Sequence, residues 1–115
     1  MNTIYFRGKD ILTGSWVYGY YYKHNEVHGI FTPGRGSERV TLETVGQLVY
    51  ELDDTMVFVG DIMTNPRGQK FEVVIYDNLP SLKPIDRQQY NAMSNGYMQN
   101  KTLIGNKFDN PELLK

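Results

Sequence analysis

The sequence predicts a mainly β fold, arranged as a small barrel or a sandwich. Glycines and prolines interrupt the 115-residue chain at intervals of about 8–12 residues, the spacing of short strands joined by turns. Residues 15–23 alternate between two kinds of side chain, as a strand with two different faces does. Only residues 84–93 have the composition of a helix. These observations predict about seven short strands and little helix.

The N-terminal third predicts three strands. Residues 3–7 are rich in β-forming side chains. Residues 15–23 form the clearest strand of the chain, because aromatic rings occupy four of its even positions. Residues 24–26 then predict a hairpin turn, and 27–32 predict the strand that returns from it. A flexible loop is expected over 33–37.

The middle of the chain is more ambiguous. Residues 41–46 fit either one helical turn or a loop that ends at a glycine, whereas 47–50 are expected to be extended. Residues 65–68, Asn-Pro-Arg-Gly, predict a turn. The alternation over 69–77 predicts a strand that pairs back onto 58–64.

The C-terminal third combines irregular and regular segments. Two prolines predict irregular structure over 78–84. Residues 84–93 are expected to form the one helix, ended by the Asn-Gly pair that follows shortly after. A last strand is expected over 101–105, and a capped terminal turn with proline at its first helical position over 110–114.

Length and composition limit the class of protein. One domain over residues 1–115 is expected, or an N-terminal subdomain of about 1–40 packed on a barrel of about 41–115. The hydrophobic and charged contents, 40% and 22%, are ordinary globular values, and without cysteine there are no disulfides. No apolar run has the length of about 18 residues that a membrane helix needs, and the N-terminus lacks the features of a signal peptide. We therefore expect a soluble intracellular protein without membrane contact.

The net charge of −1 conceals an uneven distribution of charge. Residues 41–64 contain acidic side chains but no lysine or arginine, whereas both flanking segments are mildly basic. We interpret this acidic segment as a solvated edge that faces basic side chains on neighbouring strands, and binding of a cation or a basic partner is the alternative. Its carboxylates are Glu43, Glu51, Asp53, Asp54 and Asp61.

The strand over 15–23 carries the most unusual feature of the sequence. One face of this strand is aromatic throughout, with Trp16, Tyr18, Tyr20 and Tyr22. These rings either line the core, with Val17 and Tyr21 facing outward, or form an interface with another protein, or stack on bases. We expect a division in which Trp16 and Tyr18 lie mainly in the core, while Tyr20 and Tyr22 are available to a partner.

Basic side chains supply the nucleic-acid alternative. A single-stranded nucleic acid would need cations beside the aromatic rings. The weakly acidic total charge makes this interpretation secondary to protein binding. The cationic residues that would serve it are Arg7, Lys9, Lys23, Arg35 and Arg39.

No catalytic or metal constellation is evident. Asp61 follows a glycine between two apolar runs, where its carboxylate can accept hydrogen bonds from nearby amides; a metal-dependent enzyme at this acidic segment is the alternative. His24 and His28 flank a predicted turn and, with Glu26, do not complete a transition-metal site. Residues 34–37, Gly-Arg-Gly-Ser, lack the following helix and lysine of a phosphate loop and predict a hairpin tip.

Three separated regions of the sequence carry a family resemblance. Residues 6–9 (FRGK) and 14–20 (GSWVYGY) match an opening of the form FRGK…GEWVYGY. Residues 43–47 (ETVGQ) and 60–62 (GDI) match the middle, and 103–114 (LIGNKFDNPELL) match an ending of the form VIGNIYDNPELL. The matching regions occur in the same order over most of the chain. By these residues the chain resembles the YopX-like family of phage proteins.

The resemblance implies an SH3-like β-barrel with a minor appended α+β portion. It also implies a protein encoded by a phage or an integrated prophage, which acts in the bacterial cytoplasm. Residues 48–59 depart from the family, because a shorter acidic segment replaces its glycine- and asparagine-rich hairpin. Contacts of that hairpin are therefore not carried over, and the family supplies no catalytic residue and no cofactor.

Together these observations predict a non-enzymatic accessory protein without a cofactor or a metal. We expect it to form a homo-oligomer or to bind a phage or host protein. Weak binding of single-stranded nucleic acid is the alternative function.

Overall fold

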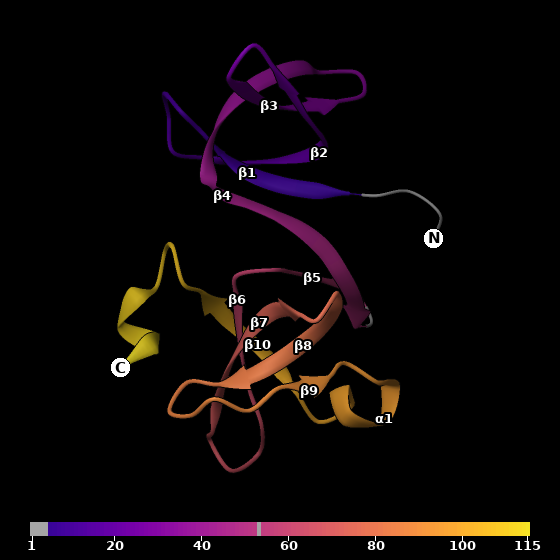
Figure 1. Cartoon of the computed structure of the whole chain (residues 1–115), viewed down its shortest axis with the longest axis vertical. Helices are drawn as coiled ribbons and strands as arrows, with labels where there is room; N and C mark the ends of the chain where they lie inside the picture. The colour runs from indigo at the N-terminus through magenta and orange to yellow at the C-terminus, as the bar shows by residue number, and fades with distance from the viewer. Residues whose placement is uncertain (1–4, 53) are drawn as a thin grey trace. The chain divides into compact units, whose positions relative to one another are not determined.

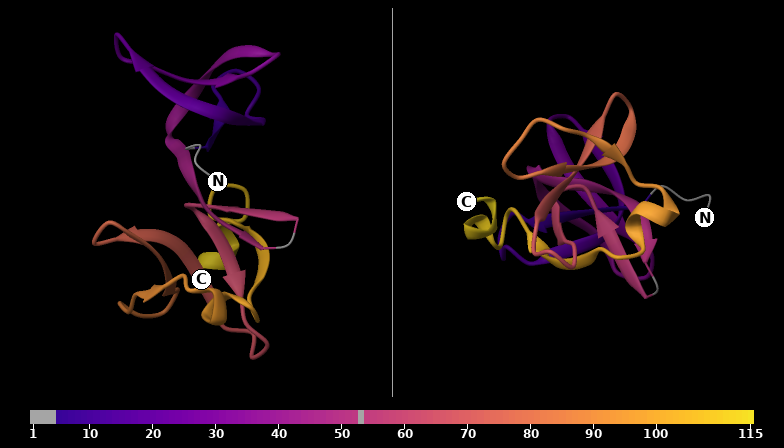
Figure 2. Two further views of the ribbon diagram at one scale, coloured as in Figure 1. Left: turned by 90° about the vertical axis from the view of Figure 1, so that its right-hand side faces the viewer. Right: turned by 90° about the horizontal axis from the view of Figure 1, so that it is seen from below.

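The computed structural model of the protein describes residues 5–52 and 54–115 (Figure 1, Figure 2). The fold is mainly β, with 59% strand and 7% helix in two antiparallel sheets, as predicted. The chain divides into two compact units, Met1–Leu48 and Val49–Lys115. The described part contains ten strands: β1 (Phe6–Asp10), β2 (Trp16–His24), β3 (Val27–Thr32), β4 (Gly36–Leu52), β5 (Thr55–Phe58), β6 (Asp61–Thr64), β7 (Lys70–Tyr76), β8 (Leu79–Pro84), β9 (Asn91–Ala92) and β10 (Thr102–Asn106).

The strands of the first unit pair in a closed circuit, in which the fourth strand pairs with the first. β1 pairs with β2, β2 with β3, β3 with β4, and β4 also pairs with β1. The register between β1 and β4 shifts between Arg7 and Lys9, where the hydroxyl Oγ1 of Thr44 accepts a hydrogen bond of 2.8 Å from the backbone N–H of Lys9. β4 is long and curved, and its pairing with β5 is part of the same sheet (Figure 1).

The β2–β3 hairpin confirms two predicted strands and corrects the turn between them. Only Asn25 and Glu26 lie outside the strands, with φ of 48° and 67°, as in a two-residue type I′ turn. The predicted three-residue turn is therefore one residue too long. The register places Tyr20 opposite Phe31 and Tyr21 opposite Ile30.

The core of the first unit lies on one face of these strands. Ile30 is fully buried and Val40 is 3% exposed. Gly8 lies directly against Val40, and Gly19 lies against Ile30 and the backbone of the same hairpin. Val17 is opposite Gly8 in the ladder and is two residues from Gly19, so Val17 and Gly19 lie on the same face of β2 as these core contacts. The odd-numbered side chains of β2 therefore face this core.

The second unit is built around an antiparallel sheet of order β10-β6-β7-β8-β9. β7 and β8 form a hairpin with a turn at Asp77 and Asn78, which have φ of 52° and 66°. The predicted pairing of the 69–77 strand onto the 58–64 segment is confirmed by the β6–β7 ladder. The buried hydrophobic cluster of this unit contains Val57, Met63, Phe71, Val73, Leu82 and Met98.

Two predictions of irregular or helical structure are wrong because they fall within strands. Residues 41–46 belong to β4. Residues 79–84 form β8, although Pro80 and Pro84 lack an N–H group. In an antiparallel hairpin with a two-residue turn, the residue pair next to the turn exchanges backbone hydrogen bonds, and hydrogen-bonded and non-hydrogen-bonded pairs then alternate. Pro80 and Pro84 both fall in non-hydrogen-bonded pairs, so neither position needs an N–H group that donates to β7.

The helix is also displaced from its predicted position. Residues 84–93 contain a turn and the short strand β9, and the helix α1 is the following segment, Asn95–Met98. Ser94 caps it by accepting a hydrogen bond from the N–H of Tyr97. The Asn-Gly pair expected to end the helix therefore lies inside it.

The last two elements lie close to their predicted positions, but the predicted side-chain cap is wrong. β10 begins and ends one residue later than the strand expected over 101–105, and the 3₁₀ helix η1 (Pro111–Leu114) has proline in its first turn. The side chain of Asn110 makes no cap bond to this helix; its Oδ1 accepts instead from the N–H of Asn106 at 3.2 Å. None of the helices in the described residues is long and apolar enough to cross a membrane.

Candidate aromatic interaction surface

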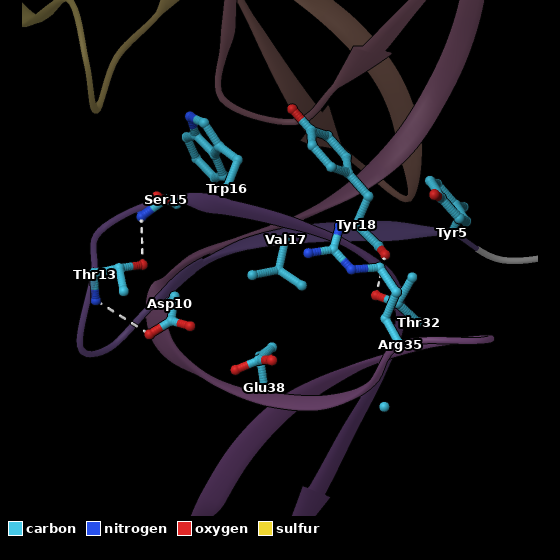
Figure 3. A pocket seen from close by; sticks show the side chains of 11 residues that line it. Tyr5, Asp10, Thr13, Ser15, Trp16, Val17, Tyr18, Thr32, Arg35 and Glu38 are labelled. Atoms are coloured by element: carbon cyan, nitrogen blue, oxygen red, sulfur yellow. Dashed lines mark hydrogen bonds between the residues drawn. The ribbon is translucent and has the colours of Figure 1, made fainter.

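Strand β2 presents the four predicted rings on the face opposite Ile30 and Val40. We define the aromatic face as Trp16, Tyr18, Tyr20 and Tyr22 of β2 together with Phe31 of β3, which lies directly opposite Tyr20. Figure 3 shows the side chains of Trp16 and Tyr18 leaving the strand on one side and Val17 on the other. The interpretation in which these rings line the core while Val17 and Tyr21 face outward is therefore wrong for this unit.

The two ends of the aromatic face differ in exposure. Trp16 and Tyr18 are half-buried, whereas Tyr20 is 40% exposed, Tyr22 37% and Phe31 44%. Tyr5 contacts Tyr20 edge-to-face, with a ring separation of 6.4 Å. The hydroxyl end of the Tyr22 ring lies over the backbone of Gly29, where no side chain intervenes. The rings nearest the hairpin turn are thus the accessible ones.

The predicted cationic residues do not form one group. Arg7 and Lys9 both lie near the Trp16 ring, with the guanidinium carbon 4.4 Å and the ammonium nitrogen 5.3 Å from its centroid. Arg7 is only 5% exposed, so its charge is largely removed from solvent. Lys23 forms an exposed ion pair with Glu26 at 3.8 Å.

The remaining two arginines belong to different surroundings. Arg39 is exposed and shares the face of Tyr22, because both residues are opposite Gly29 in their ladders. Arg35 lies at the hairpin tip predicted for residues 34–37, where its N–H donates to the carbonyl oxygen of Thr32. Its side chain lines a cavity that Trp16 and Tyr18 of the aromatic face also line (Figure 3).

This cavity of the first unit has a volume of about 400 Å³ (Figure 3). Asp10 and Glu38 contribute carboxylates to its lining, and Arg35 a guanidinium. The backbone N–H groups of Leu12 and Thr13 donate to Oδ1 of Asp10 at 2.8 and 3.2 Å and lower the pKa of that carboxyl. The lining contains hydroxyl groups but neither imidazole nor thiol, so no serine or threonine there has a histidine base.

The two histidines lie on opposite faces of the β2–β3 hairpin. His24 is opposite Val27, whereas His28 is opposite Lys23, so successive register positions direct them to different sides. His28 stacks on Tyr21 and its Nδ1 lies 2.6 Å from the tyrosine hydroxyl. The pair considered as metal ligands is therefore not brought together.

The acidic segment contains both exposed and buried carboxylates. Glu43, Glu51 and Asp54 are exposed, while Asp53 lies outside the described residues. Asp61 is 2% exposed, and its Oδ2 accepts a hydrogen bond of 2.7 Å from the backbone N–H of Phe58. The interpretation of Asp61 as a turn residue bonded to a nearby amide is confirmed.

Sequence reasoning missed Phe31 and Tyr5 as parts of the aromatic surface. The signal for Phe31 was available, because a two-residue turn at Asn25 and Glu26 places residue 31 opposite residue 20. Tyr5 had no comparable signal, since its contact with Tyr20 depends on the pairing of β1 with β2.

No protein-family model matches the sequence, and no curated protein matches it significantly. The function proposed next therefore rests on the geometry of the chain's own residues.

Proposed function

We propose that this chain is a YopX-like phage or prophage protein whose fold is a small SH3-like barrel with a minor appended α+β portion. The order of the matching regions in the sequence supports the family. The circuit of pairings through β1, β2, β3 and β4 supports a barrel, because such a circuit leaves each of these strands with at least two neighbours. A bacterial cytoplasmic location follows from the proposed family.

The function that the aromatic face supports best is non-enzymatic protein binding, either to a second copy of the chain or to a phage or host protein. The observation that carries it is the exposed cross-strand pair of Tyr20 and Phe31 beside Tyr22. Tyrosine rings provide apolar area with few rotatable bonds, and the hydroxyl remains satisfied at a wet rim. Such rings are typical centres of protein interfaces.

Light scattering after size-exclusion chromatography tests self-association, and affinity capture of phage and host proteins tests the other partner class. Both are run on the wild type and on a Tyr20→Ser, Phe31→Ser double variant. The matched control is Tyr76→Ser, Leu79→Ser, which changes exposed side chains of the second unit. We expect association to be lost only in the first variant. A monomer that captures nothing, or binding that survives the first variant, would contradict the proposal.

A second candidate function, binding of single-stranded nucleic acid, has one specific observation in its favour. Arg39 is exposed on the same face as Tyr22, so a cation accompanies accessible rings. Fluorescence anisotropy with an oligonucleotide would then show an affinity that falls steeply with salt and drops in Arg39→Gln. Absence of binding at low salt would remove this candidate.

A further inference from the structure

The second unit contains a polar cavity of about 290 Å³ that the proposed function does not use. Its lining draws on the turn before β7, on the segment between β8 and β9, and on the region of α1. The side chains that matter here carry hydrogen-bond donors: Gln69, Arg87, Gln89, Asn91, Tyr97 and Lys101. This lining contains two cationic groups and no carboxylate.

Lys101 is the unusual member of this lining, because it is a lysine only 7% exposed. Its Nζ donates to the carbonyl oxygen of Tyr97 at 2.8 Å and to Oδ1 of Asn100 at 2.7 Å. The ammonium also lies 4.0 Å from the Tyr97 ring centroid and 5.7 Å from that of Phe71. Burial lowers the pKa of this ammonium, which is the direction expected for a charge held away from water.

All of these partners of Lys101 are neutral. Among the described residues, no carboxylate forms an ion pair with its ammonium. Buried charges in proteins are normally paired, since removing an ion from water without a counter-charge is unfavourable. The hydrogen bond to the Tyr97 carbonyl explains in part why the Lys101 ammonium lies here, because a lysine after a helix stabilises the carbonyl groups of the last turn. It does not supply a negative charge.

The other donors around the cavity retain unused capacity. Arg87 donates through Nε and Nη2 to the carboxylate of Asp86 at 3.1 and 3.2 Å, and a guanidinium has five N–H groups. Gln69 accepts from Nδ2 of Asn65 through its oxygen, which leaves its NH₂ group as a donor. The cavity therefore combines a buried ammonium, a guanidinium and side-chain amides.

We propose that this cavity binds the phosphoryl group of a small molecule. A phosphoryl group offers three strong acceptor oxygens to the several donors of the lining, whereas a carboxylate offers only two oxygens. It would also provide the counter-charge that Lys101 lacks among its described partners. The Tyr97 ring, which is part of the lining, provides apolar area for the rest of the molecule.

The test is an amide NMR titration of the full chain with inorganic phosphate, and with acetate as the carboxylate arm, at constant ionic strength. A third arm uses a nucleoside monophosphate, so that binding of the phosphoryl group alone is distinguished from binding of a phosphorylated molecule. We expect saturable shifts at Tyr97 and Lys101 with both phosphates, tighter with the nucleotide, and none with acetate.

Lys101→Met should weaken phosphate binding by at least about tenfold, because it removes a charge-assisted hydrogen bond and keeps the apolar stem. Lys83→Met is the matched control, since Lys83 also donates to a backbone carbonyl but lies outside the lining. Arg87→Gln, at an exposed position, should weaken phosphate binding several-fold. If Lys101→Met does not fold, this second variant tests whether phosphate binds in the cavity. Absence of saturable shifts, equal shifts with acetate, or unchanged affinity in the folded variants would overturn the assignment.

Discussion

At the residue scale, two glycines of the β2–β3 hairpin fix how closely the strands approach. A methyl group on Gly19 would overlap the carbonyl oxygen of Phe31, which belongs to the backbone and cannot turn aside. A methyl group on Gly29 would meet the Tyr22 ring, which is a movable side chain. The position of Gly19 is therefore the more restrictive of the two.

Gly19→Ala is predicted to lower the free energy of unfolding by about 1–3 kcal/mol, because the added methyl group overpacks the hairpin. Urea denaturation followed by far-UV circular dichroism measures this change. Gly96→Ala is the control, since Gly96 lies in a helix with no atom near the added methyl group, and it should be neutral or slightly stabilising. Equal stability of the two variants would show that the Gly19 contact is unimportant.

Asp10 gives a prediction about pH. Its pKa is lowered by hydrogen bonds from the N–H groups of Leu12 and Thr13, which the unfolded chain lacks. Its contribution to stability is therefore present above the ordinary value of 3.8 and is lost as the pH falls through the lower folded value. An NMR titration should show the Leu12 and Thr13 amides shifting below pH 3.8, with no such step in Asp10→Asn. A transition above 3.8 would contradict this explanation.

At the scale of elements, the two hairpins have turns of the same kind but different chemistry. Glu26 has φ of 67° and Asn78 has φ of 66°, a left-handed conformation that asparagine tolerates better than glutamate. Glu26→Gly should raise the free energy of unfolding by about 0.5–1 kcal/mol, because the backbone strain that is relieved exceeds the stabilisation lost with the exposed ion pair between Glu26 and Lys23. Thermal denaturation should show a smaller gain for Asn78→Gly. A gain as large in Asn78→Gly, or a loss in Glu26→Gly, would contradict this account.

The elements also show which parts of the fold could be predicted from sequence. Alternating patterns predict β2 and β7, because period two is a local property of the chain. The length of the β2–β3 turn was less certain, and a three-residue turn would have placed Tyr20 opposite Ile30. That one-residue difference reverses which face of β2 is buried. The aromatic face was thus located correctly on the strand, while its relation to the core depended on the turn.

Other elements depended on how they pair with neighbouring strands. Residues 41–46 have no clear pattern of their own and become a strand by pairing with β1. β8 tolerates Pro80 and Pro84 because its register with β7 places them where no N–H is needed. The pairing of 41–46 with β1 cannot be read from the local sequence, and the positions of the prolines follow only once the turn at Asp77 and Asn78 is known. The same holds for the cavity around Lys101, whose lining comes from three separate segments.

At the scale of the whole molecule, stability depends on distinct buried groups in each unit. Leu82 is fully buried in the cluster of the second unit, while Leu79 on the same strand is 56% exposed. Leu82→Ala should cost about 2–5 kcal/mol, and Leu79→Ala should change stability by less than about 0.5 kcal/mol. The protection of the β7 amides against hydrogen exchange measures the stability of the second unit in each of the two variants. Similar protection in the two variants would show that the cluster is not the source of stability.

At the scale of the whole molecule we also propose that the aromatic face is the surface that binds protein. Hydroxyl-radical footprinting tests it most directly, by comparing side-chain oxidation at low and high protein concentration and with captured phage or host protein. We expect protection of Tyr20, Tyr22 and Phe31 on association, with Tyr76 and Leu79 unchanged as exposed references. Association that leaves Tyr20, Tyr22 and Phe31 as reactive as in the free chain would contradict it.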